Sequence, residues 1–287
     1  MTDSMGTEPQ PKIFEERLIR VGDPDAPVYR IFPLWFLEEA LRLRQLVLAR
    51  PSRWEDPLEV VGDAIAVDRR RGDRIEQKII NQSLPPAFAQ CWSMTAESDT
   101  LLRAYSRVVK DPHFRRNTCP RDEGVRVRST PRKLFQAVVN GNPSGFRGHW
   151  FVGSVKYLEH EALLQEIANA IGTHGETVFE VPSNRAKLLL LKRSAFSHEC
   201  EVRVIFVQHD TKGGDTIIRV PINPNEVFEE IAFDPRLATF ERREREAIIR
   251  SLEYTGKITE TGLYQRTLLQ VSLVDTHIDG GEEPPAA

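Results

Sequence analysis

The chain has 287 residues, of which 40% are hydrophobic and 28% are charged, and a formal net charge of −3 at pH 7. This composition is ordinary for a globular protein, and the negative balance excludes nucleic-acid binding that relies on overall charge. No stretch approaches the ~18 apolar residues of a membrane span, and no secretory signal pattern is present. We therefore expect a cytoplasmic protein without a membrane partner.

The number and spacing of the cysteines and histidines indicate the redox compartment and argue against a zinc site. The three cysteines, Cys91, Cys119 and Cys200, lie far apart and lack CxxC spacing. A scattered, odd set is typical of a reducing compartment and argues against a structural zinc site. The seven histidines form no HxxxH or HExxH pair, so we expect no zinc centre built by the protein.

Composition also predicts the domain organisation. Residues 1–25 and 276–287 are poor in residues that could pack, so both ends are predicted to be disordered. Residues 26–275 are numerous enough for one large domain. No internal repeat is visible.

In the first half of the chain, hydrophobic periodicity predicts short strands separated by helices and turns. Ser98 and Thr130 stand where N-capping residues are expected, directly before two of the helices. The polar stretch 110–122 is predicted to be a loop. In chain order we predict a strand at 27–32, a helix at 34–43, strands at 45–49 and 87–93, a helix at 99–107, a strand at 124–128 and a helix at 131–138.

The second half predicts more strands than helices. The strand at 199–207 has the clearest pattern, and Gly213-Gly214 predicts a hairpin that pairs it with 216–220. The other predictions are a strand at 150–157, helices at 159–171, 186–192 and 236–252, and strands at 227–233 and 263–273. Because strands often follow one another directly, we predict an α+β fold: a single domain with a mixed, largely antiparallel sheet flanked by helices.

Two basic stretches stand out against the acidic balance. One runs from Arg103 to Arg132, and the other is the short cluster Asp68-Arg69-Arg70-Arg71. Both fit an ordinary solvated surface, and both also fit a partner that carries phosphate groups.

Three charged residues at period two form the sharpest candidate site. In the predicted strand, Glu199, Glu201 and Arg203 share one face, with the two acids about 7 Å apart. A solvated sheet face explains such a row. A site with paired carboxylates also explains it, with one acid stabilising positive charge and the other activating an acceptor.

Four further residues are candidates for binding a ligand. Arg30 lies in an otherwise apolar strand, where it needs either an acidic partner, such as Glu201 or Glu199, or a bound anion. Ser93 and Thr95 place two hydroxyls at a strand end, where caps and turns also use them. Tyr105 lies on a predicted helix and fits either the core or a site.

Several spaced motifs resemble domain-of-unknown-function family 2971, which includes abortive-phage-infection proteins. The resemblance covers roughly residues 27–235 and implies a role in phage defence. Glu55 stands where the family has Asn, and Leu102-Arg103 stand where it has Met-Trp. The matching pieces are Tyr29-Arg30, residues 51–59, Cys91-Trp92-Ser93, residues 102–106, Gly124-Val125, Lys192 and residues 199–203.

The order of Arg30, Ser93 with Thr95, and the Glu199/Glu201 pair is similar to that in Arg-Ser-Glu mono-ADP-ribosyltransferases. This resemblance implies that NAD is the substrate and that Arg30 holds its pyrophosphate. The two hydroxyls would order the nicotinamide ribose pocket. Glu201 would bind the ribose 2′-hydroxyl and stabilise an oxocarbenium-like transition state, while Glu199 would activate the acceptor.

Two other interpretations stay open. Asp56, Glu59, Glu199 and Glu201 could bind Mg²⁺ in a nuclease, although Arg203 stands where a catalytic lysine is expected. Alternatively, the charged row is a structural ion network in a non-catalytic sensor or binding module. The acceptor, protein or nucleic acid, and the oligomeric state are not encoded in a recognisable motif.

Overall fold

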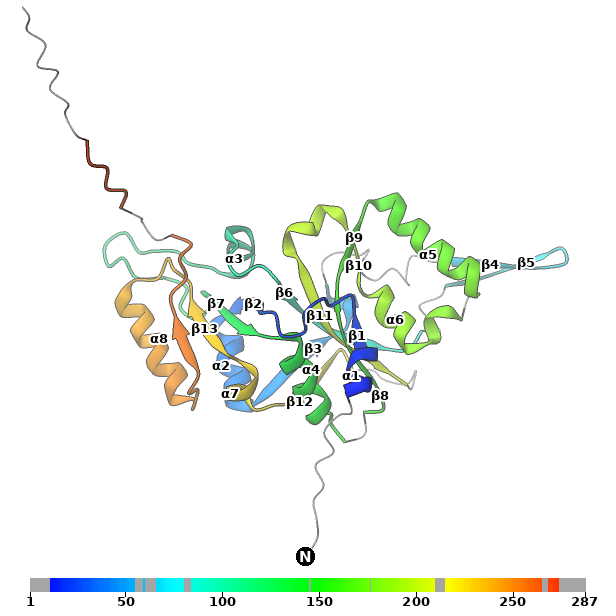
Figure 1. The fold of residues 1–287 in the computed structure, drawn as a ribbon, viewed down its shortest axis with the longest axis horizontal. Coiled ribbons are helices and arrows are strands. Elements are labelled where there is room, and N and C mark those ends of the chain that lie inside the picture. The colour runs from blue at the N-terminus through cyan, green and yellow to red at the C-terminus, as the bar shows by residue number, and fades with distance from the viewer. Residues whose placement is uncertain are drawn as a thin grey trace, which may run out of the picture.

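The computed structural model describes residues 11–54, 59, 66–79, 84–144, 146–175, 177–209, 215–264 and 268–273. Within these residues, a mixed sheet of ten strands is flanked by helices, which confirms the predicted α+β class. Figure 1 shows α8 (Thr239–Ser251) toward one end of the molecule and α5 (His160–His174) toward the other. Among the helices in this part of the chain, none combines the length and apolar character needed to cross a bilayer.

The helices and strands alternate irregularly along the chain. The first half contains α1 (Pro11–Arg17), β1 (Leu18–Ile19), β2 (Val28–Pro33), α2 (Leu34–Leu43), β3 (Gln45–Ala49), β4 (Ala66–Arg71), β5 (Arg74–Ile79), β6 (Ala87–Ser93), α3 (Asp99–Tyr105), β7 (Gly124–Ser129) and α4 (Pro131–Asn140). The second half contains β8 (Gly148–Ser154), β9 (Lys156–Leu158), α5, α6 (Pro182–Leu188), β10 (Leu191–Arg193), β11 (Glu201–Gln208), β12 (Ile217–Pro221), α7 (Pro224–Val227), β13 (Glu230–Phe233), α8 and β14 (Lys257–Thr259).

Local sequence explains where two helices begin. The Ser98 hydroxyl accepts a hydrogen bond from the Leu101 amide at 3.2 Å, at the start of α3. The Thr130 hydroxyl accepts one from the Lys133 amide at 3.2 Å, at the start of α4. Both bonds satisfy amides that have no partner within the first helical turn, as the sequence predicted.

The main sheet runs in the order β1-β8-β11-β6-β2-β7-β13-β14, and β3 joins it by pairing with β6. The pairs β1–β8 and β13–β14 are parallel, whereas the other pairs of this sheet are antiparallel. Glu201 of β11 lies opposite Ser93 of β6, and Ser93 lies opposite Tyr29 of β2. This register aligns residues from three distant parts of the chain in one row across the sheet.

The two faces of the central strand β11 enter different cores. Val202, Val204 and Phe206 join the large core, whose other members come from elements such as α2 and α4. Ile205 and Val207 join a smaller core with residues at the end of α6. The strand therefore shows the predicted alternation, but both faces are buried, so charged residues on either face need partners.

The predicted hairpin between 199–207 and 216–220 is wrong. β12 pairs with β3, with Ile218 opposite Leu48 and Val220 opposite Leu46. Both edges of β11 are already hydrogen-bonded, to β6 on one side and β8 on the other. No edge is left for β12. Residues 213 and 214 lie outside the described residues.

The ends of the chain also differ from expectation. Residues 11–19, for which composition predicts disorder, form α1 and β1, and Phe14 packs edge-on against Phe135 with ring centroids 5.2 Å apart. The predicted strand at 263–273 is wrong for the residues described there. β14 covers Lys257–Thr259 instead, and Leu268 and Leu269 are exposed without a strand partner.

The end of α4 gives a test of this topology. A Cβ at Gly141 would lie 1.9 Å from the Pro221 carbonyl oxygen of β12, whereas a Cβ at Gly172 in α5 would meet nothing within 4 Å. We expect Gly141→Ala to lower the stability by about 1–3 kcal/mol because backbone must move. Gly172→Ala, the matched control, should raise it by up to about 1 kcal/mol. Equal melting temperatures for the two variants would contradict the placement of β12.

Candidate active site

The start of β11 is shaped by a tight turn. The 3₁₀ helix Ser194–Glu199 ends at Cys200, whose φ of 45° and ψ of 53° are left-handed. That conformation costs a non-glycine residue roughly 1–2 kcal/mol. Glu199 therefore lies before the strand, and the predicted strand from 199 is wrong by two residues. Of the three charged residues in the predicted row, only Glu201 and Arg203 lie in β11, where they are two positions apart.

Glu199 and Glu201 are held together by a buried lysine, Lys192. Lys192 Nζ lies 2.5 Å from a carboxylate oxygen of Glu199, 2.6 Å from Glu201 and 2.9 Å from Glu59. The lysine side chain is 6% exposed. A buried ammonium is stable only with such partners, since its three hydrogens would otherwise lose their hydration.

Arg203 completes the cluster from the strand side. Its Nε donates to Glu201 and one terminal nitrogen donates to Glu59, both at 2.6 Å. Its other terminal nitrogen donates to the Leu189 carbonyl at 2.7 Å, and its guanidinium lies 4.4 Å from the Trp54 ring centroid. This arginine is fully buried. The interpretation of the charged row as a solvated sheet face is therefore wrong.

The cluster holds three carboxylates and two cations, so ionisation of every group would leave one excess negative charge. Burial and the hydrogen bond with Glu201 raise the pKa of Glu199 to about 7, although Lys192 opposes the shift. Burial also acts to raise the pKa of Glu201, but Arg203, Glu199 and Lys192 outweigh it and hold that pKa well below its usual range. At neutral pH, Glu201 is thus ionised while Glu199 exchanges a proton with solvent.

Ser93 fixes the backbone beside these acids. Its hydroxyl donates to the Glu199 carbonyl at 2.6 Å and accepts from the Thr95 amide at 3.0 Å. The Tyr157 hydroxyl accepts from the Glu201 amide at 2.8 Å. Ser93 is thus brought into contact with Glu199 of the predicted acidic pair, whereas the Thr95 backbone bonds to Ser93 and not to either acid.

Tyr105 lies near the acids and outside the core. Its side chain is 50% exposed. Burial of its hydroxyl end raises its pKa, and the charges of Glu199, Cys91 and Glu201 raise it further. Tyr105 is therefore half-exposed and lies within electrostatic range of the acidic pair.

Arg30 directly follows Tyr29, the β2 residue that shares a row of the sheet with Ser93 and Glu201, and it lies opposite Val127 of β7. Strand alternation places it on the face of Phe32, whose ring centroid is 5.3 Å from its guanidinium. Among the described residues, no carboxylate forms an ion pair with Arg30. Burial lowers its pKa, and the charges of Cys91 and Tyr105 partly oppose this. The predicted salt bridge to Glu201 or Glu199 is therefore not formed.

Sequence reasoning missed Lys192 as a site residue, although it belonged to the family pattern. The signal was present, because Lys192 directly follows the apolar run Leu188-Leu189-Leu190-Leu191 and so had to be buried with acidic partners. Glu59 was assigned only to a metal cluster. The structure instead bonds it to Lys192 and Arg203.

The Mg²⁺ site of the nuclease interpretation is not supported by this arrangement. Glu59, Glu199 and Glu201 all direct their oxygens at Lys192 and Arg203, which occupy the position of a cation. The described residues contain no group of three or more acidic, histidine or cysteine side chains arranged to hold a metal ion. Asp56 lies outside them.

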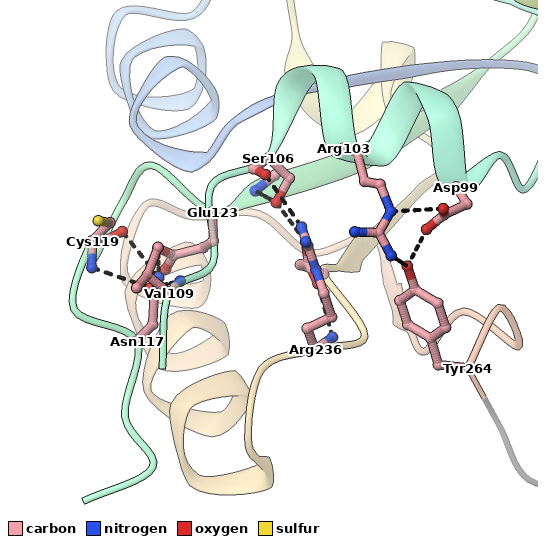
Figure 2. A network of polar contacts seen from close by, with 11 residues as sticks. Asp99, Arg103, Ser106, Val109, Asn117, Cys119, Glu123, Arg236 and Tyr264 are labelled. Carbon is pink, nitrogen blue, oxygen red and sulfur yellow. Dashed lines mark hydrogen bonds and ion pairs between the residues drawn. The ribbon is translucent and has the colours of Figure 1, made fainter. Parts of the chain in front are cut away.

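A second polar network fixes the end of α3 beside Tyr105 (Figure 2). The Ser106 hydroxyl donates to the Asp234 carboxylate and accepts from the Gly124 amide at 2.6 Å. Arg236 donates to the Ser106 carbonyl at 3.2 Å. A Cβ at Gly124 would lie 2.5 Å from the Ser106 Cβ, so this approach requires glycine. Figure 2 also shows Tyr264 meeting Asp99 and Arg103 at the opposite end of this helix.

Comparison with known proteins gives only weak similarity. No family model and no curated protein matches the chain. A structure of Thermus sp. 2.9 DarT in complex with NAD+ aligns with TM-score 0.36 and 11% identity, over 84% of this chain and 98% of that chain. The same protein in complex with ADP-ribosylated ssDNA gives 0.35 and 12%, over 85% and 97%. TM-scores of this size establish neither a common fold nor a common activity.

The ion cluster predicts unequal effects of equivalent substitutions. Glu201→Gln removes the buried carboxylate that bonds to both Lys192 and Arg203, so we expect a loss of about 3–5 kcal/mol at pH 7. Because the Glu201 pKa is lowered in the folded protein, the stability that this carboxylate contributes is fully present above the ordinary glutamate pKa. It is lost as the pH falls toward the pKa that Glu201 has in the folded protein. Glu166→Gln removes the exposed pair with Lys156 and should cost no more than about 1 kcal/mol. Urea denaturation at pH 7 measures both, and similar losses would contradict the buried network.

Proposed function

We propose that this chain consumes NAD, as an ADP-ribosyltransferase or an NAD glycohydrolase. The observation that carries the proposal is the pair of adjoining carboxylates with separated pKa values, an ionised Glu201 and a Glu199 with a pKa of about 7. Two carboxylates that differ in this way can take different roles at a glycosidic bond. The order of Arg30, Ser93 and Glu201 along the chain, typical of Arg-Ser-Glu transferases, supports the choice of NAD.

The reaction breaks the bond between ribose C1′ and the nicotinamide nitrogen. The bonding electron pair leaves with nicotinamide, which becomes neutral, and positive charge develops on the ribose. Glu201 would stabilise this charge and accept a hydrogen bond from the 2′-hydroxyl. Each of its oxygens has two lone-pair directions; Lys192 and Arg203 use one on each, and the bond with Glu199 uses one more. The carboxylate therefore keeps acceptor capacity while its position is fixed.

Glu199 would act on the group that attacks C1′. A general base works best with a pKa near the working pH, which Glu199 reaches through burial and its bond to Glu201. The base removes the proton of water or of an acceptor as the new bond forms. Since Glu199 is the more exposed of the two acids, with 17% of its side chain accessible against 7% for Glu201, an incoming acceptor meets it first.

Arg30 and the hydroxyls would bind the rest of NAD. Arg30 has no carboxylate partner among the described residues, so its guanidinium is available for a pyrophosphate. Ser93, which bonds to the Glu199 carbonyl, would order the nicotinamide ribose together with Thr95 and Tyr105. The resemblance to the family that includes abortive-infection proteins suggests a role in phage defence, with a protein or a nucleic acid as the acceptor.

A second function is favoured by one observation. The cations of the cluster are fully paired with its three carboxylates, as in a structural ion network of a non-catalytic sensor. In that case the acids hold β10, β11 and the segment at Glu59 together. Loss of the acids would then lower stability without removing any turnover.

Activity should follow the ionisation of Glu199. We expect nicotinamide release from NAD to rise about tenfold from pH 6 to pH 8, because the base form of a group with a pKa of about 7 grows by that factor. Glu199→Gln should lower the rate at pH 8 by about 10²-fold or more and abolish this pH dependence. Chromatographic detection of nicotinamide, with and without protein or nucleic-acid acceptors, measures both effects.

The control for this experiment is Glu166→Gln, which removes an exposed glutamate that binds Lys156. It should keep both the rate and the pH profile. Absence of nicotinamide release by the wild-type chain under every acceptor condition would overturn the proposed function, as would a Glu199→Gln variant that keeps its full rate and pH profile.

Arg30 should affect NAD binding more than the chemical step. Arg30→Lys keeps a positive charge but loses the planar fork, so we expect KM for NAD to rise about tenfold with a smaller change in kcat. Arg243→Lys on the exposed face of α8 is the matched control and should change neither constant. An unchanged KM in the Arg30 variant would remove this residue from the site.

A further inference from the structure

The loop between α3 and β7 contains a hydrogen-bonded turn at residues 111–116. The Asp111 amide donates to the Arg116 carbonyl at 2.8 Å, and the Arg115 amide donates to the Asp111 carbonyl at 2.9 Å. One carboxylate oxygen of Asp111 accepts from the His113 and Phe114 amides, both at 2.8 Å. Figure 1 shows this loop running from α3 toward the end of the molecule that carries α8. The backbone and Asp111 thus close the turn without using the side chains at its tip.

A buried network fixes the base of this turn to α8. The Asn117 backbone amide donates to Glu241 at 2.7 Å, and the Asn117 side chain donates to Glu123 at 3.1 Å. Arg245 also donates to Glu123, at 2.5 Å. All four side chains are buried, and Figure 2 shows the bond between Asn117 and Glu123. The turn is therefore held in one position on the surface of the domain.

The tip of the turn presents an aromatic ring to solvent. Phe114 is 80% exposed, more than any other Phe, Trp or Tyr side chain that the structure describes. The next residue, Arg115, has a φ of 53°, a left-handed conformation that costs free energy in any residue other than glycine. An exposed ring gains nothing from folding. The stability of the domain therefore does not explain this tip, whereas contact with a partner does.

Three cations of the same loop are available to that partner. Arg107, Lys110 and Arg115 are exposed, and none of them forms an ion pair with a residue that the structure describes. The fold uses the other arginine of the turn, because Arg116 pairs with Glu244 of α8. The loop therefore combines one exposed aromatic ring with three unpaired positive charges.

We propose that this loop binds a single-stranded nucleic acid, with Phe114 stacking on a base and the three cations binding phosphates. Every base has a π-face, so an exposed ring accepts any base of an unpaired strand. Arginine guanidinium groups bind phosphate oxygens through paired hydrogen bonds, and lysine adds a point charge. An apolar protein surface would match the ring but not the cations, whereas a nucleic acid matches both. The net charge of the whole chain, −3, does not oppose such a local site.

The loop begins beside the candidate active site. Arg107 is two residues from Tyr105, which lies within electrostatic range of Glu199 and Glu201. A strand bound by the loop would be the acceptor of ADP-ribose, and this extension rests on the proposed function. Binding of the strand by itself does not depend on it.

Fluorescence anisotropy with the full chain and labelled oligonucleotides, without NAD, tests the role of the ring. A single strand should bind more tightly than a duplex of the same length, because the bases of a duplex already stack on one another. Phe114→Ala should weaken single-strand binding about tenfold. It should leave the slope of log affinity against log salt unchanged, since the ring contacts no phosphate. Phe114→Trp keeps a stacking surface and should restore the affinity.

The cations should give the opposite signature in the same assay. The triple change Arg107→Gln, Lys110→Gln and Arg115→Gln should weaken binding and reduce the salt slope by about 2, since about 0.7 is lost per phosphate contact of a single strand. An oligonucleotide of abasic sites keeps the phosphates and lacks the bases. It should therefore bind the wild type and Phe114→Ala equally. Melting temperatures should stay unchanged because the altered side chains are exposed.

Two control variants alter similar side chains elsewhere. Phe36→Ala removes a ring of α2 that is 45% exposed. The triple change Arg42→Gln, Arg70→Gln and Arg219→Gln alters the net charge by the same amount at exposed positions outside the loop. Both controls should bind the single strand like the wild type.

Several outcomes would overturn this inference. They are no binding of the single strand, tighter binding of the duplex, tighter binding of a glutamate-rich peptide of equal charge, or a control triple variant as weak as the loop variant. Nicotinamide release from NAD alone should be retained by Phe114→Ala. A chain that releases nicotinamide without binding single strands would overturn this inference alone. A chain that binds them without releasing nicotinamide would overturn only the proposed function.

Discussion

A single buried ammonium group, that of Lys192, holds the candidate site together. It bonds to Glu199 and Glu201, which are two residues apart, and to Glu59 from a distant segment, and Arg203 bonds to two of the same carboxylates. None of these ions is stable alone in the interior, since the desolvation cost of each is met only by the others. The positions of β10, β11 and the segment at Glu59 therefore depend on one another.

The imbalance of this cluster gives it a chemical property that a balanced network lacks. Two cations neutralise two carboxylates, so the third, Glu199, is favoured in its protonated form and has a pKa of about 7. The pKa values differ because Glu201 bonds to both cations, whereas Glu199 bonds to Lys192 but not to Arg203 and lies nearer to solvent. The same arrangement that stabilises the fold thus produces a group that titrates near neutral pH.

The surroundings of the acids are fixed by independent means. Ser93 holds the Glu199 carbonyl, and the network of Ser106, Asp234 and Arg236 fixes the end of the helix that carries Tyr105. The pairing of β2 with β6 places Tyr29, the neighbour of Arg30, opposite Ser93. The backbone around the acids is therefore held at several points in addition to the ion cluster.

Local pattern determined much of this protein from sequence. Periodicity and capping residues located β2, α2, β6, α3 and α4 because neighbouring residues decide those features. Sequence order also identified Ser93, Glu199 and Glu201 as belonging together. The partner of β12 was decided by tertiary structure alone, because both edges of β11 were already paired. The cation between the acids was likewise a tertiary outcome. Spacing along a strand fixes which residues share a face, but only the packed fold brings Lys192 from one strand and Glu59 from a distant segment to the same carboxylates.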